Sequence, residues 1–117
     1  MRHQKKQNKL SLRAGRRAGL LRNLAQSLVI YEQIKTTEAK AKALKSYIER
    51  LINNAKKDNK MNAIRESNRY FTDKIASRKL MEVLVKKYEN KSSGFTRITK
   101  MGDRVGDAAP MVIIELI

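Results

Sequence analysis

The chain has 117 residues, of which 27 are Lys or Arg and 11 are Asp or Glu, so its formal net charge is +16. This length suits one domain with one core, and the absence of cysteine excludes disulfides and thiolate metal sites. No apolar run approaches the length of a membrane span, and we expect a soluble protein that is not secreted. So large an excess of positive charge indicates a polyanionic partner, with nucleic acid as the leading candidate.

The N-terminal segment concentrates this charge, because eight cations precede Leu24 and the first acid is Glu32. We expect residues 1–10 to be a basic nucleic-acid-binding arm that is disordered alone, and residues 11–117 to be a single domain whose first helix is capped by Ser11. A mitochondrial transit peptide is also Arg-rich and poor in acids. It is disfavoured here by many Lys and Gln residues, little Ser, and no apolar face before Leu20.

Two amphipathic helices flank a short strand in the first half of the chain. Apolar residues recur at helical spacing from Leu20 to Val29, which predicts the first helix. The stretch YEQIKTT that follows predicts a strand at residues 33–36. Thr37 is expected to cap a second helix, whose apolar stripe runs from Ala41 to Ala55.

Two further helices are predicted after the polar break at residues 57–60. The first is weaker, with Met61 and Ile64 expected to face inward, and Tyr70 and Phe71 as further candidates. Asp73 is expected to cap the second of these helices. Its predicted apolar stripe consists of Ile75, Ala76, Leu80, Val83, Leu84 and Tyr88.

The C-terminal part changes from helical to strand chemistry. FTRITKM predicts a strand at residues 95–101, a Gly- and Asp-containing loop follows, and MVIIELI predicts a well-buried strand at residues 111–117. The predicted order is therefore α-β-α-α-α-β-β. We expect a two-layer α+β fold in which helices cover one face of a small sheet.

The sequence offers little for catalysis. His3 is the single histidine and lies in the arm, where no rigid surroundings would hold a catalytic base. Asp103 and Asp107 flank a glycine-containing turn and are expected to bond to backbone amides rather than to a metal ion. The loop also lacks the spacing of a phosphate-binding loop. We therefore predict no enzyme, no cofactor and no metal site.

The basic residues fall into groups with different expectations. Lysines on the predicted central helices are interleaved with acids, which is typical of a solvated surface. Arg97, Lys100 and Arg104 instead lie near the predicted connection of two strands. A hairpin there could push cations into a groove, so an architectural DNA-binding protein is the alternative function.

Five motifs in order resemble the bacterial large-subunit ribosomal protein seventeen family. They are MRH (1–3), LLRNLAQSLV (20–29), IKTTEAKAKAL (34–44), GFTRITK (94–100) and GDAAPMVIIEL (106–116). The resemblance covers nearly the whole chain. It departs from the family pattern at residues 14–17, AGRR, where members often have a Ser-Ser-His-Arg type of sequence.

This resemblance implies an α+β structural component of the large ribosomal subunit, without catalysis, near the exit of the peptide tunnel in the cytoplasmic ribosome. Its implied partners are large-subunit ribosomal RNA and neighbouring ribosomal proteins, with no membrane, small-molecule substrate or obligate homo-oligomer. Recognition is expected mainly through RNA shape and phosphates. The residues expected to contact RNA are Arg2, His3, Lys5, Lys6, Lys9, Arg13, Arg16, Arg17, Arg22, Asn23, Lys35, Thr36, Thr37, Arg97, Lys100 and Arg104.

Overall fold

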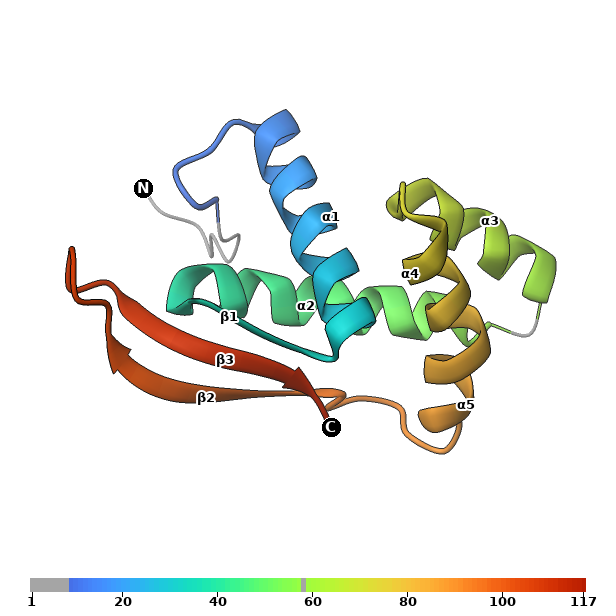
Figure 1. The fold of residues 1–117 in the computed structure, drawn as a ribbon. Coiled ribbons are helices and arrows are strands. Elements are labelled where there is room, and N and C mark those ends of the chain that lie inside the picture. Colours follow the sequence, from blue (N-terminus) through green and yellow to red (C-terminus); the bar gives the residue numbers. More distant parts are fainter. Residues whose placement is uncertain (1–8, 58) are drawn as a thin grey trace, which may run out of the picture.

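Helices and strands follow one another in the predicted order in a computed structural model that describes residues 9–57 and 59–117 (Figure 1). The last helical segment contains a short π-helical turn, η1, between α4 and α5. The bounds are α1 Ala14–Tyr31, β1 Gln33–Thr37, α2 Glu38–Ala55, α3 Lys60–Tyr70, α4 Lys74–Lys79, η1 Leu80–Leu84, α5 Val85–Lys87, β2 Thr96–Asp103 and β3 Pro110–Leu116. The α+β class is confirmed.

The three strands form one antiparallel sheet in the order β1-β3-β2. Ile114 lies at the centre, opposite Ile34 on one side and Ile98 on the other. A bulge between Lys100 and Gly102 interrupts the β2–β3 register, and Gly102 takes a positive φ of 96°, which glycine adopts without strain. The strand that is last in sequence is therefore the middle of the sheet.

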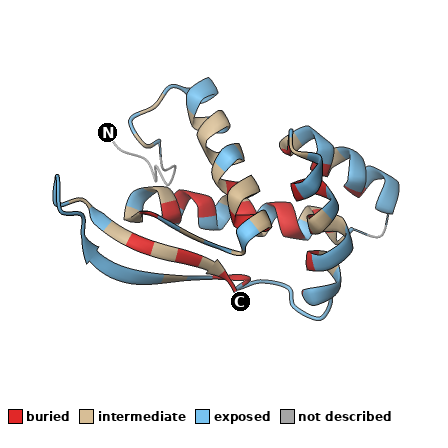
Figure 2. Ribbon diagram, viewed as in Figure 1, coloured by how far each residue is buried: buried red, intermediate tan, exposed pale blue. Residues whose placement is uncertain are grey.

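One face of the sheet forms the core with α2, which lies beside the sheet in Figure 1. Val112, Ile114 and Leu116 alternate along β3 and are buried, whereas the residues between them are only half-buried (Figure 2). The expectation that the whole strand is well buried is thus right for one face only, because the other face is turned away from α2. The predicted stripe of α2 is confirmed and includes Leu44 and Ile48, both 0% exposed.

Helix α1 is anchored by its C-terminal half. Ala25, Leu28 and Val29 are fully buried, whereas the N-terminal half is exposed or half-buried and projects from the body (Figure 2). Gln26 ties this helix to the start of α4, because its Oε1 accepts 2.8 Å from the backbone N–H of Asp73. The basic end of α1 is consequently held out beside the core rather than packed into it.

The inward faces of α3 and of the α4–η1 segment differ from the prediction. Met61, Ile64, Ile75 and Val83 were expected to face the core but are 64%, 46%, 68% and 49% exposed. The two helices instead bury small side chains, including those of Ala63, Ser67, Ala76 and Ser77. Small residues permit a close approach that leaves the larger flanking side chains outside. Within the predicted set, Phe71, Ala76, Leu80, Leu84 and Tyr88 are buried as expected and Tyr70 is half-buried.

The three predicted caps have different outcomes. The prediction for Ser11 is wrong, because α1 begins at Ala14 with Arg13 as its N-cap, and Ser11 lies in a turn with a φ of 55°. Thr37 occupies the N-cap of α2 but makes no side-chain capping bond. The cap predicted at Asp73 is confirmed, since its carboxylate accepts a hydrogen bond of 2.9 Å from the backbone N–H of Ile75.

Candidate nucleic-acid interface

The N-terminus of α1 is an exposed, positively charged end. Lys9, Arg13 and Arg16 are exposed, and no acidic residue lies in the first turn of this helix. Ser11, Leu12, Arg13 and Arg16 line an open hollow of about 450 Å³. The backbone N–H groups at the start of a helix carry partial positive charge, which adds to that of the arginines. This arrangement suits contact with phosphate.

Arg17 has a different position from its neighbours. Its Nη1 donates 3.4 Å to the carbonyl oxygen of Leu12, so the side chain folds back on the turn that precedes the helix. One edge of the guanidinium thereby supports the local backbone. The remaining donors can still reach an external acceptor, because an arginine side chain has five N–H groups.

The two arginines of the β2–β3 hairpin are already paired with carboxylates. Arg97 Nη2 lies 2.6 Å from Glu115 Oε1, a contact made possible by their direct opposition across the strands. Arg104 donates from Nε and Nη2 to the two oxygens of Asp107, at 2.8 and 2.6 Å. These hydrogen bonds, together with one from the Ala109 amide, lower the pKa of Asp107 to about 2. Both arginines are exposed, but their charge is compensated locally.

Lys35 and Lys100 lie on the same sheet without such compensation. Lys35 is opposite Ile113 on β3, and Thr99 of β2 is opposite Ile113 on its other side, so Lys35 and Thr99 share a row on the face turned away from α2. Within residues 9–57 and 59–117, no carboxylate forms an ion pair with Lys9, Arg13, Arg16, Lys35 or Lys100. These five side chains are the uncompensated cations of the interface.

Four other predicted contacts differ in how far they are buried or bonded within the fold. Thr36 is 7% exposed and lies on the sheet face that packs against α2, whereas its neighbour Thr37 is half-buried. Arg22 is half-buried, and its Nε is buried without a hydrogen-bond partner among the described residues. Burial raises the pKa of Tyr47, an effect that the nearby charge of Arg22 opposes. Asn23 accepts 3.3 Å from Gln26, the residue that joins α1 to α4.

Comparison with known proteins identifies the family. A sequence model described as ribosomal protein L17 matches residues 20–117. A large ribosomal subunit protein bL17 from Rickettsia bellii is 46% identical over 117 residues, covering all of this chain and 82% of the relative. Another from Endomicrobium trichonymphae is 43% identical, covering 94% of this chain and 93% of the relative. The chain belongs to the ribosomal protein L17 family.

The basic end of α1 lies at the boundary of the L17 family match. The match to the family begins at Leu20, whereas the alignment with the Rickettsia relative covers the whole chain. The AGRR sequence at residues 14–17 therefore precedes the matched region and forms the first turn of α1. The predicted contacts Arg2, His3, Lys5 and Lys6 lie outside the described residues.

In the described part of this L17 family member, no group of three or more His, Cys, Asp or Glu side chains could hold a metal ion, and no helix is long and apolar enough to span a membrane. Asp107 follows the expected turn behaviour, because its carboxylate also accepts 3.3 Å from the backbone N–H of Ala109.

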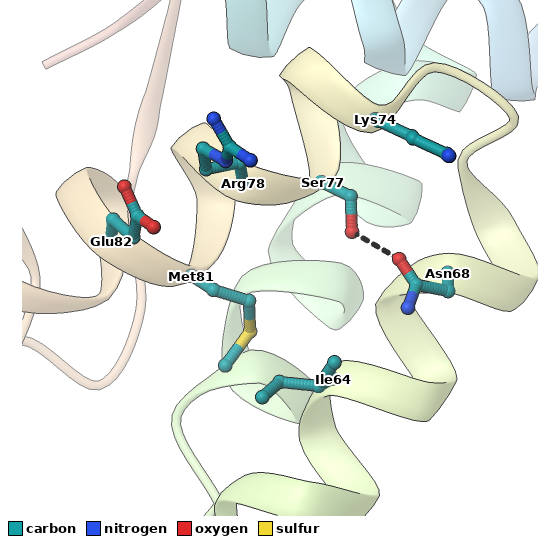
Figure 3. A pocket seen from close by; sticks show the side chains of 7 residues that line it. All are labelled: Ile64, Asn68, Lys74, Ser77, Arg78, Met81 and Glu82. Atoms are coloured by element: carbon teal, nitrogen blue, oxygen red, sulfur yellow. Dashed lines mark hydrogen bonds between the residues drawn. The ribbon is translucent and has the colours of Figure 1, made fainter.

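One surface feature was not predicted from sequence. A pocket lies between α3 and the α4–η1 segment, and two of its lining residues, Lys74 and Arg78, are exposed cations (Figure 3). Its lining residues come from two helical segments and span positions 64–82. The one sequence feature that could have indicated this pocket is the apolar residue Ile64, but its helical spacing predicted a core-facing position instead.

Proposed function

We propose that this protein is a structural component of the large ribosomal subunit that binds large-subunit ribosomal RNA and catalyses no reaction. The observation that carries this proposal is the 46% identity, over all 117 residues, to a relative named as a large ribosomal subunit protein. The net charge of +16 supports it, because a polyanion can neutralise such an excess. The place of action is then the ribosome in the cytoplasm, beside neighbouring ribosomal proteins.

The uncompensated cations supply most of the electrostatic affinity in this proposal. Lys9, Arg13 and Arg16 act with the positive end of α1, and Arg2, His3, Lys5 and Lys6 are proposed to contact the RNA as well. Lys35 and Lys100 contribute from the sheet. Each cation that neutralises a phosphate releases condensed counterions, so affinity falls steeply as salt rises.

Arg97 and Arg104 take a different part in the same surface. Each guanidinium has one edge occupied by a carboxylate and other N–H groups still exposed. We expect these residues to position the hairpin against RNA, with Thr37, Arg17, Arg22 and Asn23 as peripheral contacts. Contacts to phosphates would supply affinity, and contacts to 2′-hydroxyls would favour RNA over DNA. From the family resemblance, we also propose that the protein lies near the exit of the peptide tunnel.

Two experiments test the assignment. The tagged full-length chain should co-sediment with large ribosomal subunits in moderate salt, and failure to do so would refute the structural role. In competition binding at physiological salt, structured ribosomal RNA should outcompete duplex DNA of equal length. Equal affinity for both would favour an architectural DNA-binding protein instead. Crosslinks mapped on ribosomal RNA would then test the location near the tunnel exit.

A further inference from the structure

The pocket between α3 and the α4–η1 segment has an apolar floor that is open to the surface. Its volume is about 220 Å³. Ile64 comes from α3 and Met81 from η1, and Figure 3 shows the Met81 side chain directed toward Ile64. The pocket is smaller than the roughly 300 Å³ at which sites for drug-sized ligands begin. It therefore has room for one ring system rather than for an extended ligand.

A fixed amide forms one wall of the pocket. The Ser77 hydroxyl donates 2.8 Å to Oδ1 of Asn68, which orients the amide group (Figure 3). The Asn68 nitrogen then points toward Ile64, and no described residue accepts its two N–H groups. The pocket thus presents oriented donors beside an apolar floor.

The rim of the pocket carries positive charge. Lys74 and Arg78 are exposed, and within the described residues neither forms an ion pair with a carboxylate. Glu82 also lines the pocket and contributes one negative charge. The balance at the rim favours an anionic ligand, and the planar guanidinium of Arg78 can also stack on an aromatic ring.

We propose that this pocket binds one unstacked nucleotide of the RNA partner. The base lies against Ile64 and Met81, its polar edge accepts hydrogen bonds from Asn68, and its phosphate lies near Lys74 and Arg78. Proteins that read single-stranded RNA use this combination of a stacking surface, edge hydrogen bonds and cations. An apolar side chain from a protein partner would cover the floor but leave the Asn68 donors without acceptors, which is unfavourable.

This inference rests on the proposed function, and the first experiment separates the two. Asn68→Asp keeps an acceptor for Ser77 but replaces the amide donors by a second acceptor. Asn62→Asp is the matched control, because Asn62 is exposed on the same helix and does not line the pocket. Asn68→Asp should weaken binding to deproteinised large-subunit ribosomal RNA about 3- to 10-fold more than the control does.

The outcomes of this comparison are distinct. If the two variants bind equally and the wild type binds the RNA in a salt-dependent way, the proposal that the pocket binds a nucleotide is refuted. The proposed function is then left intact. A wild-type chain that did not bind the RNA at all would refute the proposed function. Circular dichroism of both variants checks that each is folded.

A second experiment observes the pocket directly in the full chain. With ¹³C-methyl methionine, the Met81 methyl group reports on the pocket floor, and Met61, which is 64% exposed on α3 and lies outside the pocket, is the internal control. Addition of hexa-adenylate or hexa-uridylate should shift the Met81 signal several times more than the Met61 signal. Equal or absent shifts with both oligonucleotides would overturn the proposal, and a protein partner would then be the better occupant.

Discussion

The contrast between compensated and uncompensated arginines leads to a quantitative prediction. Arg13 and Arg16 have no carboxylate partner among the described residues, whereas Arg97 and Arg104 are each paired at 2.6 Å. The double variants Arg13→Gln/Arg16→Gln and Arg97→Gln/Arg104→Gln remove the same formal charge. Their effects on RNA binding should nevertheless differ, because only unpaired cations are available to replace the counterions of the RNA without first leaving a protein partner.

The expected magnitude follows from counterion release. Each neutralised phosphate contributes about 0.7–0.9 to the slope of log affinity against log salt concentration. Loss of Arg13 and Arg16 should therefore reduce the slope by about 1.5, and loss of the two paired arginines by about half that or less.

Filter binding of the full-length variants to large-subunit ribosomal RNA over a salt series measures these slopes, with a folded-state check by circular dichroism. Equal reductions in the two double variants would refute the reasoning, because they would show that formal charge alone determines binding. A larger reduction in the hairpin variant would show that the paired arginines leave their carboxylates when RNA binds.

Three further changes test other parts of the structure. Tyr88→Phe should leave stability unchanged or raise it by up to about 1 kcal/mol in chemical denaturation, because the hydroxyl is buried with no described hydrogen-bond partner; a clear loss would reveal a partner. Gly15→Ala should stabilise α1 by about 0.5–1 kcal/mol, measured by thermal unfolding, since the added Cβ meets no atom within 4 Å; weaker RNA binding by a more stable variant would indicate close approach of the RNA backbone there. The Asp107 carboxyl should titrate in NMR at about 2 and move toward about 3.9 in Arg104→Gln. Because folding lowers this pKa, its contribution to stability is complete above about pH 3.9 and is lost as the pH falls through 2; an unchanged titration in the variant would contradict the pairing.

The elements with strong local patterns could be predicted from the sequence. The stripe of α2 repeats at helical spacing along the whole helix, and β1 and β3 are rich in β-branched or apolar residues, so local chemistry and tertiary packing favour the same structure there. In α3 and α4, local chemistry and tertiary packing favour different positions for the apolar side chains. Ile64 and Ile75 have the polarity of core residues, but close packing through Ala63 and Ser67 places them outside.

The contacts between residues far apart in the sequence could not be predicted, because they depend on how the elements pair and pack. Arg97 and Glu115 are 18 residues apart and meet only because β2 and β3 pair in one particular alignment. Gln26 reaches Asp73 across 47 positions. A composition count treats Arg97 and Arg13 as equal charges, whereas their pairing in the fold makes them different.

The central position of β3 has a consequence for how the chain folds during its own synthesis. β1 and β2 are made earlier, but each pairs with β3, and β3 occupies residues 110–116. Ile34 must therefore wait for Ile114, 80 positions later, before its strand has a neighbour in the sheet. Helices with local contacts can form while translation proceeds, whereas long-range strand pairing is slow and comes late. The sheet that carries Lys35 and Lys100 can be assembled only after that last strand has left the ribosome that makes it.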